Sequence, residues 1–286
     1  MDKKLLMFIG FGLVALALAF EPLRDLMNSA ARGEYYSHIV LIPLVTCYLF
    51  YQERKEVFRK ATPSSGIGGI LVVGGLALYL MGFTLDIRLS ENDLVALWVF
   101  SALVFWIGVF ILLYGWQAFR RNAFPFLFLI FTIPIPDIIM QKIIYALQVA
   151  STEVSEAIFY LSGVPYDRQG FVFHLPGVSI EVAEVCSGIR SSLALFITSV
   201  LAGHFFLDRL WKKVALAVVV FPVTVFKNGL RIITLSLLGV YVDPSFLGRG
   251  ILHTSGGFFF FPPALALLGL ALWALRRQGQ KKIEKG

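Results

Sequence analysis

The sequence predicts an all-α polytopic membrane protein with about eight transmembrane helices, and with a short amphipathic helix and a β-hairpin before the sixth. Hydrophobic residues make up 58% of the 286-residue chain, and only 15% are charged. Mean hydropathy is +0.79, whereas soluble domains are only about 45–50% apolar. Apolar stretches near the length of a membrane span recur along the chain. Of the loops that connect them, every second one is rich in lysine and arginine. These observations predict an integral membrane protein with one membrane domain over residues 1–286.

Eight apolar stretches are candidate membrane helices, since a spanning helix needs about 20 mostly apolar residues. They are residues 5–20, 38–51, 66–85, 94–116, 124–136, 188–207, 214–240 and 257–275. The second and fifth are shorter than a full span, which leaves seven or eight spans. The first follows Lys3 and Lys4 like a signal peptide, but it lacks a small-residue cleavage site before Glu21, so we expect a retained helix.

Loop charges predict the orientation. With the N-terminus in the cytoplasm, inner segments hold 16 of the 25 basic residues, outer loops hold 6 and helices hold 3. Cytoplasmic loops are enriched in Lys and Arg, and seven helices would place the basic tail 276–286 outside. We therefore expect eight spans in the cell membrane with both termini cytoplasmic. The net charge of +7 then reflects this bias and does not indicate nucleic-acid binding.

One long segment, residues 137–187, lies outside the cytoplasm in this topology. Residues 137–161 have apolar side chains at helical spacing with polar ones between, which predicts an amphipathic helix on the outer surface. Residues 171–175 and 178–182 read as two short strands around a Pro-Gly turn. This hairpin leads directly to a cysteine.

Cys186 is the first candidate for chemistry. Ser187 and Gly188 follow it and leave room around the thiol. Arg190 shares a helix face with Cys186 if the helix starts at or before the cysteine, and a nearby guanidinium lowers the pKa of a thiol. The alternative is that Cys186 is a small buried hydrophobe.

Charged residues also occur inside the seventh predicted helix, where they are costly and by default functional or paired. Asn228 and Arg231 are three residues apart and share a face, whereas Lys227 and Arg231 should repel unless one snorkels away. A structural ion pair or snorkelling is the alternative for Arg231. His253 precedes the eighth helix and by itself could be incidental.

The predicted topology places Cys186, Arg231 and His253 at the outer membrane face. A thiol, a fixed cation and an imidazole are the groups that acyl transfer requires. The chain has no P-loop, GxGxxG, HExxH or CxxC motif, and its two cysteines imply no disulfide framework. We expect no metal and no cofactor.

At these residues the sequence resembles the exosortase/archaeosortase family, over about residues 36–262. The strongest matches are the segment from Glu184 to Ser191, then the segment from Asn228 to Arg231, and then His253 with the two glycines 256 and 257. The resemblance implies a cysteine-dependent transpeptidase that cleaves the C-terminal sorting signal of exported proteins. Such a signal consists of a motif, one membrane helix and a basic tail.

The resemblance also implies roles for the residues. Cys186 is the expected nucleophile and Arg231 and His253 are its expected partners, with Arg190, Asn228 and Ser187 in support. The expected partners of the protein are membrane-anchored substrates, the lipid bilayer and an unidentified acceptor that is a lipid, a polysaccharide or water. Three alternatives stay open: a transporter or channel, a non-catalytic assembly factor for polysaccharide export, and a lipid-modifying acyltransferase.

Overall fold

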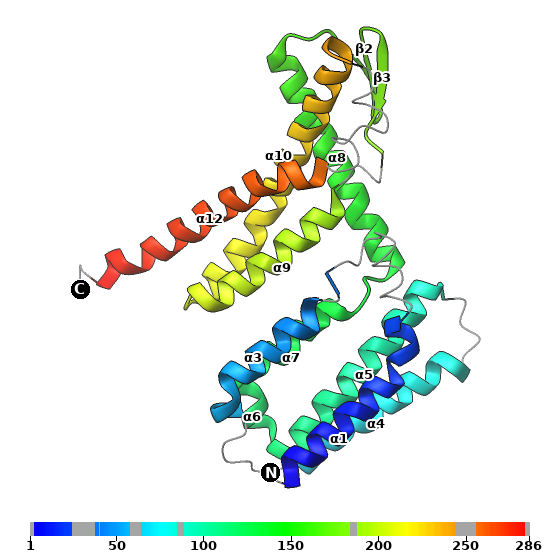
Figure 1. Cartoon of the computed structure of the whole chain (residues 1–286), viewed down its shortest axis with the longest axis vertical. Helices are drawn as coiled ribbons and strands as arrows, with labels where there is room; N and C mark the ends of the chain where they lie inside the picture. The colour runs from blue at the N-terminus through cyan, green and yellow to red at the C-terminus, as the bar shows by residue number, and fades with distance from the viewer. Residues whose placement is uncertain are drawn as a thin grey trace. The chain divides into compact units, whose positions relative to one another are not determined.

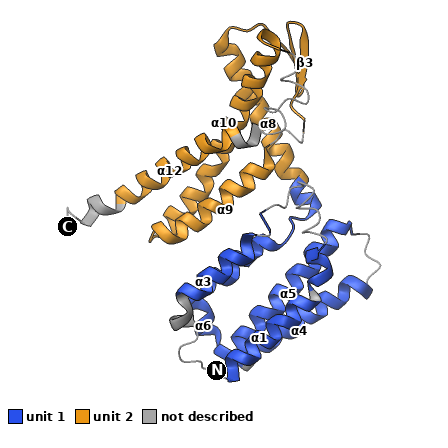
Figure 2. Ribbon diagram, viewed as in Figure 1, with its two compact units in different colours: residues 1–140 blue, residues 141–286 orange. Residues whose placement is uncertain are grey.

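Helices form nearly all of the regular structure (Figure 1). The computed structural model describes residues 3–24, 38–39, 41–57, 64–84, 89–183, 188–243 and 256–283. The chain forms two compact units, residues 1–140 and 141–286 (Figure 2). The single domain that the sequence predicts stays a prediction.

The first unit is organised around one long helix, α5 (Glu91–Tyr114). The Ser90 side chain accepts a hydrogen bond from the Asp93 amide at 3.1 Å and so caps the start of α5, while Gly115 ends it with φ at 89°. α5 packs against α1 (Lys3–Leu18) and α4 (Ser65–Thr84). The shorter elements are α3 (Leu41–Val57), α6 (Trp116–Arg121), α7 (Ala123–Phe128) and η1 (Leu129–Thr132).

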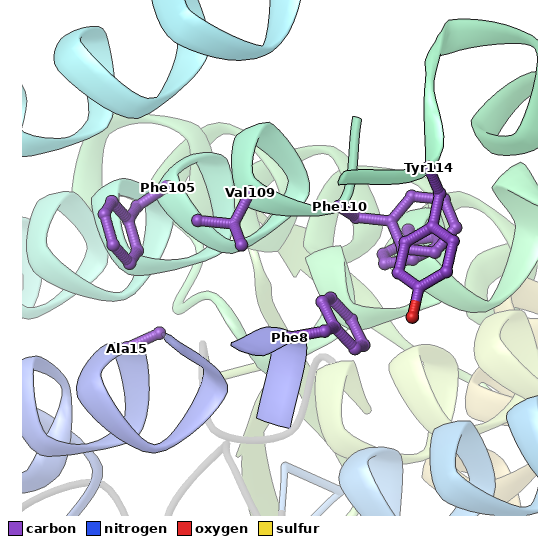
Figure 3. Packing of buried hydrophobic residues seen from close by; sticks show 7 residues of the cluster. Phe8, Ala15, Phe105, Val109, Phe110 and Tyr114 are labelled. Atoms are coloured by element: carbon purple, nitrogen blue, oxygen red, sulfur yellow. The ribbon is translucent and has the colours of Figure 1, made fainter. Parts of the chain in front are cut away.

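Aromatic side chains join α1 to α5. Phe8 stacks on Trp106 with ring centroids 5.0 Å apart and meets Phe110 edge-on at 5.5 Å. Figure 3 shows Phe8 turned toward Phe110 and Tyr114 across the space between the two helices. Because each aromatic ring buries a large apolar area, this cluster fixes α1 against the long helix.

The second unit contains a helical bundle and a small sheet. α9 (Ile189–Phe206), α10 (Leu210–Tyr241) and α12 (Gly256–Ile283) pack against one another through buried residues that include Leu195, Leu216 and Leu268 (Figure 1). The strands β1 (Asp167–Gln169), β2 (Val172–Leu175) and β3 (Val178–Glu181) form an antiparallel sheet in the order β1-β2-β3.

The sheet and the end of α10 share one core with α8 (Asp137–Ser162). Phe159 of α8 and Phe173 of β2 are fully buried, with ring centroids 5.1 Å apart, and Ile232 and Ile233 of α10 complete the cluster. The last third of α10 therefore packs against a mixed helix-and-sheet layer, whereas its earlier part packs within the bundle.

The predicted fold class is confirmed. Each of the eight predicted apolar stretches holds a helix, and the amphipathic helix and the hairpin appear as α8, β2 and β3. Among the described residues, five helices are long and apolar enough to cross a membrane: α4, α5, α9, α10 and α12. A sixth span results only if residues 123–132 and 137–162 count together, and these are bent by 84° at their break.

The helices in the first two predicted spans do not reach the length of a full membrane span. α1 has 16 residues and α3 has 17, which is below the roughly 20 that a full span requires. Strand β1 was missed, because its sequence Asp-Arg-Gln lacks the alternation of apolar and polar residues that identifies strands.

Candidate active site

Two cations of α10 lie at the far end of an apolar stretch. Residues 214–226 contain no charged side chain, and Lys213 and Lys227 bound this stretch. At a rise of about 1.5 Å per residue the two lysines are about 21 Å apart along the helix, which is shorter than the bilayer's hydrocarbon thickness of about 30 Å.

Lys227 does not snorkel to the surface, contrary to one of the possibilities that the sequence left open. Its side chain is only 6% exposed. The ammonium group donates a hydrogen bond to the Ser191 hydroxyl at the start of α9. Arg231, one turn further along α10, is half-buried and lies close enough to repel the Lys227 charge. The two cations therefore lie close together, and Lys227 is the one that contacts the first turn of α9.

The first turn of α9 is built on Gly188. This glycine has φ at 73°, a left-handed conformation that L side chains rarely adopt, and no side chain caps the helix. Instead, its carbonyl accepts hydrogen bonds from the hydroxyls of Ser191 at 2.9 Å and Ser192 at 2.7 Å. A Cβ at Gly188 would lie 3.1 Å from Asn228 Oδ1 and 3.4 Å from Lys227 Nζ. Only glycine allows α10 to approach the turn this closely.

Polar side chains on one face of α8 hold two other parts of this site. Gln148 Nε2 donates to the Val182 carbonyl at 2.6 Å, just after β3. Asn228 donates to Ser151 Oγ at 3.0 Å. All three side chains are buried, and buried polar groups without partners are costly, so these bonds fix α8, α10 and the end of β3 in register.

The segment that carries the predicted nucleophile lies between two of these fixed points. Val182 is bound by α8, and Gly188 packs against α10. Cys186 and Ser187 lie between them in sequence but outside the described residues, as does His253. Of the predicted site residues, the structure brings Asn228 to the start of α9, and Arg231 follows it by three residues on α10. The positions of Cys186, Ser187 and His253 stay untested.

Arg190 differs from the sequence-based expectation in one respect. α9 begins at Ile189, after Cys186, so the helical spacing that would place Arg190 beside the thiol does not apply, and the Arg190 side chain is exposed. Its supporting role stays a prediction without that argument.

The sequence analysis assigned no role at this site to three residues that form its contacts: Gln148, Ser151 and Ser191. The first two belong to a polar stripe on α8, with Thr152 and Ser155, at helical spacing i, i+3, i+4 and i+7. This spacing was a usable signal. Polar stripes normally face water, however, and this one is buried against α10 and the end of β3.

An ion cluster attaches the sheet to α8. Arg168 of β1 donates to Glu153 at 2.8 Å and also bonds Glu156, and its Nε donates to the Gly170 carbonyl. The hydrogen bonds to Glu153 and Glu156 raise the pKa of the Arg168 guanidinium, so it keeps its charge. Within the described ranges, no group of three or more His, Cys, Asp or Glu residues is placed to hold a metal ion.

The fold defines a multi-pass membrane protein with a buried polar site at the end of its helical bundle. The sequence model described as "Transmembrane exosortase (Exosortase_EpsH)" matches residues 27–270. The chain therefore belongs to the transmembrane exosortase family, which consists of transpeptidases that process sorting signals. No curated protein and no solved structure matches the chain.

Proposed function

We propose that the protein cleaves the C-terminal sorting signal of exported, membrane-anchored proteins and transfers the new C-terminus to an acceptor. Family membership supports the class of substrate. The observation that carries the proposal is the meeting of two segments far apart in sequence. Gly188, two residues after Cys186, packs directly against Asn228, three residues before Arg231.

The proposed reaction begins with the Cys186 thiolate. The thiolate attacks the scissile carbonyl carbon, and the tetrahedral intermediate collapses to an acyl-thioester with release of the amine. Arg231 stabilises the negative charge on the thiolate or the oxyanion, and it cannot act as a proton donor because a guanidinium stays protonated in proteins.

His253 is the proposed acid and base, because an imidazole titrates near neutral pH. As the imidazolium it protonates the leaving amine, and as the neutral imidazole it then removes a proton from the acceptor. The acceptor's oxygen or nitrogen attacks the thioester carbonyl, and the Cys186 thiolate leaves, which restores the starting state. Water, a lipid or a polysaccharide can each fill the acceptor role in this scheme.

The distribution of polar groups also supports an enzyme over a transporter. In α10, the 13 residues from Val214 to Phe226 are uncharged, and Thr224 is the polar side chain among them. A transport path requires polar groups near the middle of the membrane. Here the side-chain hydrogen bonds that join α10 to α8 and α9 lie at Lys227 and Asn228 among the described residues.

A cleavage assay tests the proposal. The protein is co-expressed with a tagged substrate that ends in a motif, a membrane helix and a basic tail, and the size of the tagged product is measured. We expect wild type to shorten the substrate and Cys186→Ala to leave it at full length. Cys47→Ala removes the other cysteine, which is exposed on α3, and should process normally. Equal processing by wild type and Cys186→Ala would contradict the proposal.

A further inference from the structure

Lys227 stands out among the buried groups that the proposed reaction does not use. It is as buried as Lys212 in the same helix, each at 6% exposure. Lys212 donates to the Leu275 carbonyl of α12 at 2.5 Å, which ties two helices of the bundle together. Lys227 instead contacts only the neutral Ser191 hydroxyl among its described hydrogen-bond partners.

Keeping an ammonium group in this place is costly. Burial removes its hydration, and repulsion from Arg231 adds to that cost. A methionine of similar length would pack in the same space without either penalty. The positive charge of Lys227 therefore has a role beyond filling space in the core. The contacts of its ammonium group indicate that role.

The ammonium group acts on the first turn of α9. Lys227 donates to the Ser191 hydroxyl, and that hydroxyl donates to the Gly188 carbonyl. Lys227 Nζ would also lie 3.4 Å from a Cβ at Gly188. A chain of two hydrogen bonds thus runs from α10 to the backbone two residues after Cys186. Cys186 precedes this glycine by two residues in the sequence.

We propose that Lys227 is a positioning residue of the reaction, which holds the first turn of α9 through Ser191 and keeps a positive charge beside the point where the Cys186 segment enters that turn. This inference rests on the proposed function. Among the described residues of the adjoining elements, the charged side chains include Arg231 on α10, the exposed Arg190 on α9 and the exposed Glu181 at the end of β3, while α8 contributes the neutral Ser151 and Ser155. A thiolate next to such a cation forms at lower pH.

The test measures the alkylation of Cys186 by iodoacetamide as a function of pH, in full-length protein purified in detergent. Cys47→Ala serves as the background, so that Cys186 is the remaining thiol. In Lys227→Met, the pH of half-maximal alkylation rate should rise by about one unit, because a thiolate loses the stabilisation that a neighbouring positive charge provides. Lys227→Arg should stay near the background value.

Lys212→Met is the matched control, since it makes the same substitution at an equally buried lysine of the same helix. It should lower thermal stability and leave the alkylation profile in place. In the cleavage assay, Lys227→Met should lower kcat about tenfold or more with KM within about twofold, because the group acts on the reacting centre and not on substrate binding. Lys227→Arg should recover most of kcat.

An alkylation profile that is unchanged in Lys227→Met would overturn the inference, as would an equal shift in Lys212→Met. Where Lys227→Met gives no folded protein, Ser191→Ala removes a single oxygen from the same chain of hydrogen bonds, and an unchanged kcat in that variant would also overturn it. If Cys186→Ala is inactive and Lys227→Met is normal, only the positioning role fails. If Cys186→Ala still processes substrate, the proposed function itself is wrong and the role of Lys227 falls with it.

Discussion

Asn228 links three segments that lie far apart in the sequence. It belongs to α10, donates to Ser151 of α8, and lies against Gly188 at the start of α9. Its side chain is fully buried. An amide carries both donor and acceptor atoms, so one side chain can serve two neighbours inside the protein. The sequence predicted that Asn228 supports the catalytic residues, and these two contacts give a structural reason for an asparagine at this position.

Gly188→Ala tests this arrangement at the scale of one residue. The new methyl group forces a left-handed alanine, which costs about 1–2 kcal/mol, and it crowds Asn228 Oδ1 at 3.1 Å. We expect a loss of several degrees in Tm and a strong loss of substrate processing. Both are measured on the detergent-purified protein and in the cleavage assay.

Gly163→Ala is the control for Gly188→Ala. Gly163 has φ at 71°, but a Cβ there meets nothing within 4 Å. The backbone strain is then the same and the contact with α10 is absent, so Tm should fall while processing per folded molecule stays normal. Equal loss of processing in both variants would show that strain, and not the contact with Asn228, is what matters.

At the scale of elements, α4 and α5 illustrate how membrane helices pack through glycine. A Cβ at Gly75 would lie 2.7 Å from the Phe105 amide nitrogen, and one at Gly68 would lie 2.6 Å from the Leu112 nitrogen. Lipid tails are as apolar as leucine side chains, so helices in a bilayer associate by close backbone approach and not by hiding apolar surface from water. The seven-residue spacing of these glycines places both on one face of α4.

Gly75→Ala should separate the two helices and lower the Tm of the purified protein, since overpacking in a tight interface costs about 1–3 kcal/mol. The neighbouring Gly74→Ala is the control, because a Cβ at Gly74 meets nothing within 4 Å. It should keep or raise Tm, given the higher helix propensity of alanine. A similar fall in Tm for both variants would contradict the proposed role of the α4–α5 contact.

At the scale of the whole molecule, the orientation in the membrane remains a prediction from the loop charges. A green fluorescent protein fused after residue 286 should fluoresce, because it folds on the cytoplasmic side. Alkaline phosphatase inserted at Gly177, in the exposed turn between β2 and β3, should be active, because it requires the outer side. A dark C-terminal fusion together with an inactive insertion would invert the predicted topology.

One observation agrees with the predicted extramembrane segment. α10 has 32 residues, which corresponds to about 48 Å of helix, whereas the hydrocarbon layer is about 30 Å thick. An upright α10 therefore extends beyond the bilayer, and its last third packs on the sheet and on α8. Residues 137–187 supply that sheet and all of α8, as expected for an extramembrane segment.

The sequence by itself determined the class of protein, the positions of the helices and the hairpin. A helix in lipid must satisfy its own backbone and be apolar over about 20 residues, so local composition is enough to locate it. The sequence also indicated Asn228 and Arg231, because polar groups inside an apolar helix are conspicuous.

The tertiary structure decided which side chains meet. The bond from Lys227 to Ser191 joins residues 36 positions apart, and the bond from Gln148 to Val182 joins residues 34 apart. Neither can be read from spacing, because both depend on how α8, α9 and α10 pack. Packing also decided where the polar stripe on α8 faces. Its spacing alone suggested a face toward water, and the fold buried that face against α10 and the end of β3, where the polar groups hold the site together.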